Sequence, residues 1–306
     1  MRWVLRLLFL GFVAALAVSG YGYWIATRPP VVREARVEVR RWPAGAPPVR
    51  LLLISDIHVA GPDMPPSRLD AIVGQINALA PDVVLIAGDF ISEKRVATHA
   101  YSFDEIAFPL RRLQAPLGVF AVLGNHDYWV DAPAARAALT RAGVRVLFNE
   151  AVRAGPLAIG GLDDDYTGHA DLGRTVVAMQ MAGGVPVLLS HSPDPFPDLP
   201  VDVPLMVAGH THCGQISLPL VGPLATASRY GNRYACGRIN ERGRTLIVGA
   251  GVGTSIVPVR IGAVPDMWLV ELGPAAPAAP AAPAAKPRPT PSAAGETSPE
   301  KRRTER

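Results

Sequence analysis

The sequence has 306 residues, of which 49% are hydrophobic and 18% charged, so it is long enough for one large or two ordinary globular domains. The formal net charge of +4 is uneven, because residues 1–41 carry +5, residues 273–306 carry +3 and residues 42–272 carry −4. This distribution does not indicate a nucleic-acid partner. A mildly acidic middle suits a cation-binding site, and basic ends suit an anionic membrane surface.

The N-terminal segment is apolar from residue 7 to residue 26, about the twenty residues that a bilayer requires, and it ends in Tyr21, Tyr23 and Trp24. It is a membrane anchor or a signal peptide. A cleavage site could lie at residues 15–17, but the aromatic belt favours an uncleaved single-pass anchor over residues 1–28. Arginines on both sides leave the orientation open, and we favour an inner (cell) membrane protein whose catalytic domain is extracytoplasmic.

Three further regions follow the anchor. Residues 29–48 are proline-rich and form a stiff connector or a first edge strand. Residues 49–272 have the composition of a folded domain. Residues 273–306 are rich in Pro, Ala and charge, so we expect a disordered tail.

Within residues 49–272, five continuous apolar runs are typical of buried strands, and each ends at Asp, Asn or His. These runs are residues 49–54, 83–87, 117–123, 185–189 and 205–208. Shorter strands are expected at residues 144–148, 157–159, 245–248, 256–260 and 267–271. Helices are expected at residues 69–79, 103–113, 131–142 and 172–181. Strands that alternate with helices predict α/β crossovers, which bring strand ends to one edge of a sheet.

The strand ends collect an unusual set of side chains: Asp56, His58, Asp89, Asn125, His191, His210 and His212, with His126 in addition. Five of the seven histidines in the chain lie in these motifs, and only His99 and His169 do not. Carboxylates and neutral imidazoles without thiolates favour Mn, Fe or Zn. Seven ligands are too many for one ion. If one carboxylate bridges two ions, the seven ligands form two sites of four. Such a pair of sites suits hydrolysis at phosphorus, in which a metal-bridging hydroxide attacks and an imidazole protonates the leaving group.

Two cysteines, Cys213 and Cys236, exclude a disulfide scaffold and a Cys-based zinc module. We expect two small, partly buried thiols rather than a bridge, although their spacing would permit one in an oxidising compartment.

Taken together, Asp56-Ile57-His58, Gly88-Asp89, Gly124-Asn125-His126-Asp127, His191 and Gly209-His210-Thr211-His212 resemble the motifs of the calcineurin-like metallophosphoesterases. The motif set spans residues 51–215. With the N-terminal membrane segment and residues 251–260, the likeness extends to the membrane-associated bacterial phosphodiesterase branch and to about residue 272.

The resemblance implies a four-layer α-β-β-α sandwich of two mixed sheets. It assigns one metal ion to Asp56, His58, Asp89 and His212, and the other to Asp89, Asn125, His191 and His210, with Asp89 as the bridge. His126 would act on the substrate, with Asp127 orienting it. Cys213 stands where Gly is common in the family.

The leading hypothesis is a dimetal phosphoesterase that hydrolyses a phosphodiester or pyrophosphate in a membrane-proximal substrate, such as a lipid-linked head group. One alternative is a UDP-2,3-diacylglucosamine-type pyrophosphatase of lipid A synthesis, which requires a cytoplasmic site. A second is a non-catalytic, metal-binding membrane scaffold, which predicts a missing ligand or a replaced His126; neither is found.

Overall fold

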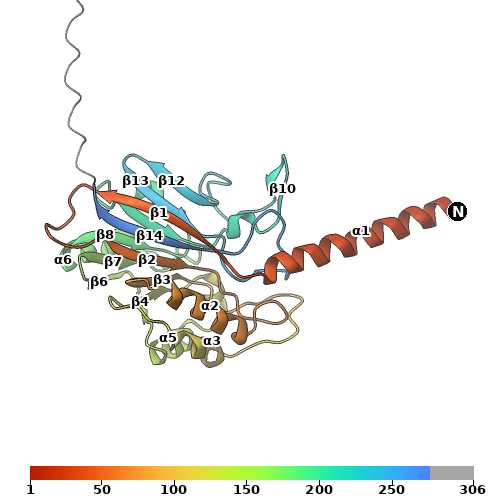
Figure 1. Cartoon of the computed structure of the whole chain (residues 1–306), viewed down its shortest axis with the longest axis horizontal. Helices are drawn as coiled ribbons and strands as arrows, with labels where there is room; N and C mark the ends of the chain where they lie inside the picture. Colours follow the sequence, from red (N-terminus) through yellow and green to blue (C-terminus); the bar gives the residue numbers. More distant parts are fainter. Residues whose placement is uncertain (276–306) are drawn as a thin grey trace, which may run out of the picture. The chain divides into compact units, whose positions relative to one another are not determined.

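The computed structural model describes residues 1–275 (Figure 1). Its helices are α1 (Arg2–Thr27), α2 (Pro66–Ala78), α3 (Phe103–Leu110), α4 (Asn125–Val130), α5 (Ala132–Arg141) and α6 (Leu172–Ala182), with short 3-10 turns at Phe196–Asp198 and His212–Gly214. The expected disordered tail at residues 273–306 lies almost entirely outside the described residues, which end at 275. Residues 273 and 274, however, belong to the last strand.

The strands form two six-stranded mixed sheets and one small hairpin. The first sheet has the order β1 (Val31–Val39), β14 (Asp266–Pro274), β2 (Val49–Ile54), β3 (Val83–Ala87), β4 (Val119–Val122) and β5 (Arg145–Val146). The second has the order β12 (Gly237–Glu241), β13 (Arg244–Val248), β9 (Leu205–Ala208), β8 (Val185–Leu189), β7 (Leu157–Gly161) and β6 (Glu150–Ala154). The hairpin is β10 (Ser217–Leu218) and β11 (Gly222–Pro223).

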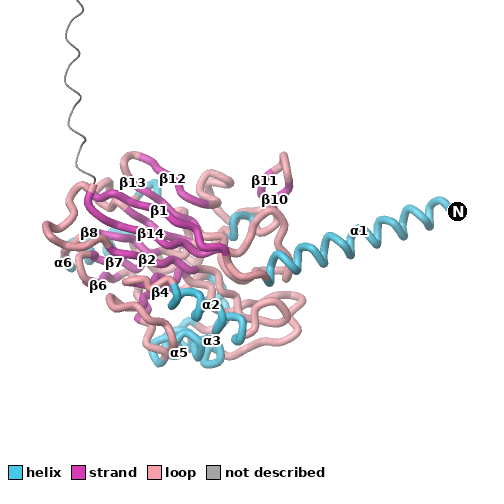
Figure 2. The backbone as a smooth tube through the Cα atoms, in the orientation of Figure 1, coloured by secondary structure: helices cyan, strands magenta, loops and turns pink. Residues whose placement is uncertain are grey.

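Both faces of the central strands are buried, which explains why their sequences are continuously apolar rather than alternating. In β2, Leu51 and Leu53 point into a core shared with strands of the second sheet, whereas Leu52 and Ile54 point into a core shared with α2, α3 and α5. A third core lies on the outer face of the second sheet, under α6. The result is the predicted four-layer α-β-β-α sandwich (Figures 1 and 2).

Of the two alternatives for residues 29–48, the structure shows the edge strand: residues 31–39 form β1, parallel to β14, so the first sheet begins before residue 49. Two other local expectations are corrected. Residues 256–260 form no strand, and the Arg260 guanidinium at their end points inward and donates to the carbonyls of Ala250, Gly251 and Gly253. Asn125 begins a short helix, α4, that the sequence analysis did not anticipate.

The predicted membrane segment is the helix α1, the one helix in residues 1–275 that is long and apolar enough to cross a membrane. Nearly all of its side chains are exposed, and only Gly22, Ile25 and Ala26 near its C-terminal end are buried.

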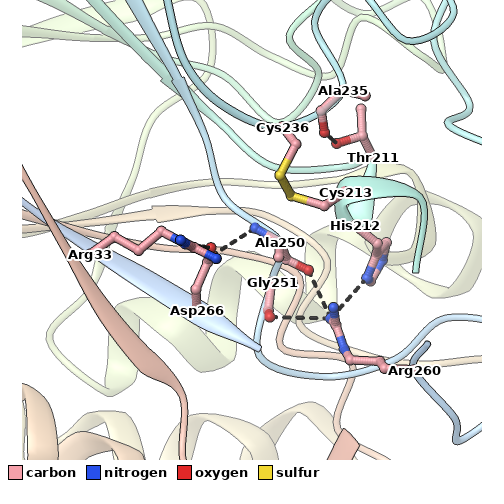
Figure 3. Close-up of a disulfide and its surroundings, with 10 residues drawn as sticks. All are labelled: Arg33, Thr211, His212, Cys213, Ala235, Cys236, Ala250, Gly251, Arg260 and Asp266. Carbon is pink, nitrogen blue, oxygen red and sulfur yellow. Dashed lines mark hydrogen bonds and ion pairs between the residues drawn. A yellow bond between two sulfur atoms is a disulfide. The ribbon is translucent and has the colours of Figure 1, made fainter. Parts of the chain in front are cut away.

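The expectation of free thiols was wrong: Cys213 and Cys236 form a disulfide, with Cα atoms 4.7 Å apart (Figure 3). The neighbouring residues bring them together, because the Thr211 hydroxyl donates to the Ala235 carbonyl over 2.6 Å. This approach follows from tertiary packing between two loops 23 residues apart, which residue spacing alone cannot indicate.

We expect Cys236→Ser to lower the free energy of unfolding by about 2–4 kcal/mol, because the variant loses a cross-link that restrains the unfolded chain. Urea unfolding of the full chain with and without reductant would measure the change. Reductant should destabilise the natural protein by a similar amount and leave Cys236→Ser unaffected; equal stability of the two proteins without reductant would contradict the prediction.

Candidate metal centre

The seven candidate ligands follow the carboxyl ends of five strands that belong to both large sheets. Asp56 and His58 follow β2, Asp89 follows β3, and α4 begins with Asn125 just beyond β4. In the second sheet, His191 follows β8, and His210 and His212 follow β9. The β2–β3–β4 and β7–β8–β9 segments are parallel, so these ends lie at one edge of each sheet, the usual position of a site in such folds.

The two sheets are joined directly at this edge. The backbone N–H of His210, after β9, donates to the Asp56 carboxylate, after β2, over 2.9 Å. Within the second sheet, the backbone N–H of Gly209 donates to the carbonyl of His191 over 2.9 Å, which holds the ends of β8 and β9 together. All seven candidate ligands are buried, so the structure brings together every residue of the predicted ligand set.

The candidate ligands form two groups around Asp89. Asp56, His58 and His212 supply donor atoms within 4.8 Å of one another, and so do Asp89, His191 and His210. A third group at the same spacing, His58, Asp89 and His126, shares members with both and includes the ring that the family resemblance assigns to the substrate. The Asn125 amide oxygen lies 3.1 Å from Nε2 of His191, which adds it to the second group. Oδ2 of Asp89 lies 3.4 Å from Nε2 of His58 and 3.3 Å from Nε2 of His191, between the two groups.

The histidine tautomers fit metal binding. Nδ1 of His58 lies 3.1 Å from the Ile91 carbonyl, and Nδ1 of His191 lies 2.7 Å from the Ala87 carbonyl. Nε2 of His210 lies 3.0 Å from the Ala227 carbonyl. A carbonyl can only accept, so each of these nitrogens carries the proton when the ring is neutral, and the opposite nitrogen presents its lone pair to the centre.

The inward nitrogens of different histidines face one another at short distances. Nε2 of His58 is 3.0 Å from Nε2 of His212, and Nδ1 of His210 is 3.1 Å from Nε2 of His191. Without an ion each pair can share one proton, because the Arg260 guanidinium donates to Nδ1 of His212 and leaves the His212 proton on Nε2, and because the raised pKa of His191 keeps a proton on its Nε2. Loss of those protons would leave converging lone pairs. The donor set therefore fits divalent metal ions.

His212 is held differently. Its Nδ1 lies 3.3 Å from the buried Arg260 guanidinium, the longest of the four contacts that this Nη2 atom makes (Figure 3). The same guanidinium lies among backbone carbonyls of residues 250–253, so it fixes that loop against the His212 ring. Arg260 was expected only as part of the family resemblance of residues 251–260, and its sequence position does not indicate that its side chain reaches His212.

The backbone at the centre is strained. Five of the seven candidate ligands are non-glycine residues with positive φ: Asp56 (49°), His58 (48°), Asp89 (55°), His210 (70°) and His212 (52°). Such conformations are costly for residues with a Cβ and cluster at functional sites, where packing enforces them.

The pKa values show how strongly the buried charges interact. Burial alone would raise the pKa of Asp89, but His191 and His58 hold that pKa well below its usual value. Burial alone would lower the pKa of His191, but the Asp89 charge raises it well above its usual value. Burial lowers the pKa values of His58 and His212, so those rings are neutral. The centre thus holds a positive charge on His191 beside Asp89 and neutral imidazoles at His58 and His212, so His191 would release its Nε2 proton on binding a metal ion.

Two glycines are required by close approach. A Cβ at Gly124 would collide with the Asp89 carboxylate and would lie 2.7 Å from Cε1 of His191. A Cβ at Gly209 would collide with the Asp56 carboxylate. Both glycines therefore allow backbone from one strand end to lie against a candidate ligand from another.

His126 and Asp127 occupy different positions. The His126 ring packs edge-on against His58 with centroids 4.7 Å apart, and its backbone N–H donates to Asp89 over 2.9 Å. Nδ1 of His126 is buried without a hydrogen-bond partner among the described residues, 3.7 Å from the Glu93 carboxylate. Nε2 is 3.5 Å from Oγ of Ser255.

Asp127 does not contact the His126 ring, so the expectation that it orients His126 is not met. Its carboxylate instead accepts from the backbone N–H groups of Asp89, Phe90, Ile91 and Gly124 over 2.9–3.3 Å. Burial and the Asp89 charge raise the pKa of Asp127 to about 7, against the effect of those donors. Asp127 therefore shapes the loop that carries Asp89, and Glu93 is the acid beside His126.

A cavity of about 560 Å³ lies next to the centre, lined by Asp165, Tyr166, Asp194, Thr226, Ala227, Ser228 and Arg229. It adjoins His210, whose ring is 4.8 Å from that of Tyr166 and whose Nε2 contacts Ala227. Arg229 pairs with Asp165 over 3.1 Å and with Asp194 over 3.6 Å. Of the three consecutive aspartates at 163–165, Asp165 therefore lines the cavity. The Asp164 carboxylate instead accepts a hydrogen bond from the backbone N–H of Thr167 in the same turn.

Comparisons with known proteins agree with this geometry. Residues 49–214 match the family described as calcineurin-like phosphoesterase. The chain is 31% identical over 274 residues to "Transmembrane protein with metallophosphoesterase domain" of Danio rerio, covering 83% of this chain and 60% of that protein. It therefore spans about 60% of the length of this relative and of its Bos taurus counterpart.

Two bacterial proteins are similar over most of their own length. "Uncharacterized metallophosphoesterase YkuE" of Bacillus subtilis (strain 168) is 29% identical over 271 residues, which cover 85% of this chain and 92% of that protein. "Phosphodiesterase YaeI" of Escherichia coli (strain K12) is 30% identical over 265 residues, which cover 83% of this chain and 93% of that protein.

We expect Gly209→Ala to destabilise the protein by about 1–3 kcal/mol, because the added methyl group overpacks the contact between Gly209 and Asp56. Thermal unfolding would measure the change. The matched control is Gly74→Ala in α2, where a Cβ meets nothing within 4 Å and should stabilise by about 0.5–1 kcal/mol. Equal effects of the two substitutions would contradict the close approach.

Proposed function

Because the chain belongs to the calcineurin-like phosphoesterase family, we propose that it hydrolyses phosphodiesters or pyrophosphates with two divalent metal ions held at the strand ends. The observation that carries this proposal is the position of Asp89, whose carboxylate lies between two groups of buried imidazoles from different sheets. A carboxylate in that position can share its oxygens between two ions.

The proposed ligand sets follow the two groups. Asp56, His58, Asp89 and His212 hold one ion, and Asp89, Asn125, His191 and His210 hold the other. Imidazole and carboxylate donors suit Mn, Fe or Zn. When bound, the two ions would polarise the phosphoryl oxygens and lower the pKa of a water molecule so that it can attack phosphorus.

The chain itself would supply the leaving-group proton through His126. Its ring lies against His58, and its backbone is tied to Asp89. Glu93, 3.7 Å from Nδ1, can stabilise the protonated ring, while Nε2 on the other side can donate to the departing oxygen. Trp129 packs against the same ring with centroids 4.8 Å apart and restricts its motion.

The cavity beside His210 would hold a further part of the substrate. Arg229 is 60% exposed there and paired with Asp165 and Asp194, so the lining offers both a guanidinium and carboxylates, while Tyr166 supplies an aromatic surface. A phosphate ester could therefore place its phosphorus at the metal centre and its substituent in this cavity.

We further propose that residues 1–28 anchor the chain in a cell membrane and that the catalytic domain is extracytoplasmic. The length and exposure of α1 support the anchor, and relatives are named as transmembrane proteins. The Cys213–Cys236 disulfide supports an oxidising compartment, since cytosolic proteins seldom keep such bonds. The same bond argues against a cytoplasmic pyrophosphatase of lipid A synthesis.

His126→Ala is expected to lower the turnover of bis-p-nitrophenyl phosphate by about 10²–10⁴-fold, because general acid catalysis is lost, while the metal content is retained. The matched control is His99→Ala, an exposed histidine outside the centre, which should keep full activity. Full activity in His126→Ala would rule out the role assigned to this ring. A normal metal content with no activity in the natural protein toward diesters or pyrophosphates would favour the scaffold hypothesis.

Asp89→Asn is expected to deplete both ions, because the shared carboxylate contributes to both ligand sets. Elemental analysis of the purified full chain would count metal ions per chain. Asp70→Asn is the matched control, since Asp70 is a partly exposed residue of α2, outside the centre, that pairs with Arg112. Two ions retained per chain in Asp89→Asn would disprove the bridging role.

A further inference from the structure

Two loops expose apolar side chains beside the candidate metal centre. The first, residues 216–228, contains the hairpin β10–β11, which lies apart from the two large sheets in Figure 2. Its Leu220 is fully exposed and Val221 is 67% exposed. The second, residues 254–259, carries Ile256, 61% exposed. We refer to these two segments as the apolar loops. Exposed apolar residues gathered in this way often mark a contact surface.

The apolar loops are joined to each other through Gln215. The Gln215 side-chain amide donates to the carbonyls of Val257 and Val259 over 3.0 and 3.1 Å, and its oxygen accepts from the backbone N–H of Ser255 over 2.9 Å. Ile216, at the base of the hairpin, bridges to Ile261. The two loops therefore form one unit.

This unit also contacts the end of α1. The backbone N–H of Arg260 donates to the carbonyl of Gly22 over 2.9 Å. The packing is tight, because a Cβ at Gly22 would lie 3.1 Å from Cβ of Val259. The Tyr23 hydroxyl donates to the Pro62 carbonyl over 3.2 Å. The end of the membrane segment is thus attached to the backbone that carries the second apolar loop.

The composition of the apolar loops suits a lipid surface better than a second protein. Residues 216–228 and 254–259 contain no charged residue. Arg229 directly follows the first loop and is largely exposed, and Arg28 directly follows α1. Uncharged apolar loops beside the end of an apolar helix suit the interface of a bilayer, where exposed apolar side chains gain burial and no charge has to be desolvated.

We propose that the apolar loops insert into the interface of the bilayer in which α1 is anchored, so that the metal centre faces the membrane surface. The inference rests on the proposed anchoring by residues 1–28 and extends it. The apolar loops lie close to the candidate centre: the first begins just after Gln215, which follows His212 by three residues, and Oγ of Ser255 in the second lies 3.5 Å from Nε2 of His126. Insertion of the loops would therefore bring the reacting groups next to lipid head groups. The substrate class that fits is a phosphodiester or pyrophosphate carried by a lipid.

Site-specific fluorescence can test the insertion in the full chain, reconstituted in nanodiscs that contain anionic phospholipid. Both natural cysteines are in the disulfide, so Leu220→Cys offers a single thiol for an environment-sensitive label such as NBD. Leu8→Cys in α1 is the control for anchoring. Met181→Cys in α6, 84% exposed and outside the apolar loops, is the control for a solvated site.

We expect the labels at positions 220 and 8 to show blue-shifted emission and a loss of intensity with doxyl-labelled lipids, and the label at position 181 to show neither. Water-like, unquenched emission at position 220 would overturn the proposal. If the label at position 8 is quenched while the label at position 220 is not, α1 is in the bilayer and only the insertion of the apolar loops is ruled out. If neither label is quenched, the proposed anchoring is ruled out as well. A blue shift at position 220 without quenching by doxyl lipids would indicate contact with protein, such as a second copy, and would also overturn it.

Discussion

The negative charge of Asp89 is the constraint on which the centre depends. It lies buried where strand ends from two sheets meet, within 3.3–3.4 Å of imidazoles from each sheet. A buried carboxylate is unfavourable unless positive charge and hydrogen-bond donors surround it. The surrounding features meet this need: His126 donates its backbone N–H to Asp89, and Asp127 holds the loop through Asp89 and its two successors. The fold thus uses one carboxylate to shape the loop that carries another.

The close approach of the sheet ends explains the strained backbone and the glycines. Chains that enter one small volume from five strands leave little space for side chains, so Gly124 and Gly209 lie against the carboxylates of Asp89 and Asp56. The ligands themselves turn sharply into left-handed conformations to aim their donor atoms at a common point. Local strain of this kind persists because the packed sheets and their hydrogen bonds outweigh it.

Much of the fold, and the meeting of the candidate ligands at one edge, could be predicted from sequence, because both depend on local patterns. The run Leu51 to Ile54 is apolar at every position since both of its faces are buried, and Asp56 and His58 follow where such a strand must end. What could not be predicted depends on contacts between distant segments. The pairing of β1 with β14 joins residues more than 230 apart in the chain. The Cys213–Cys236 bond and the hydrogen bonds of Asp127 depend on how loops pack together. Arg260 reaches His212 from a loop whose apolar sequence had predicted a strand.

Arg260 links the features that otherwise look separate. Its backbone holds the end of α1 through Gly22, its guanidinium lies beside His212, and its carbonyl acceptors belong to residues 250–253. Burial lowers its pKa to about 10, so the group still carries a charge at neutral pH and its contacts remain charge-assisted. On the other side of His212, the disulfide fixes Cys213, which itself has positive φ. His212 is therefore held between a cross-linked loop and an arginine whose backbone N–H is bonded to the end of α1.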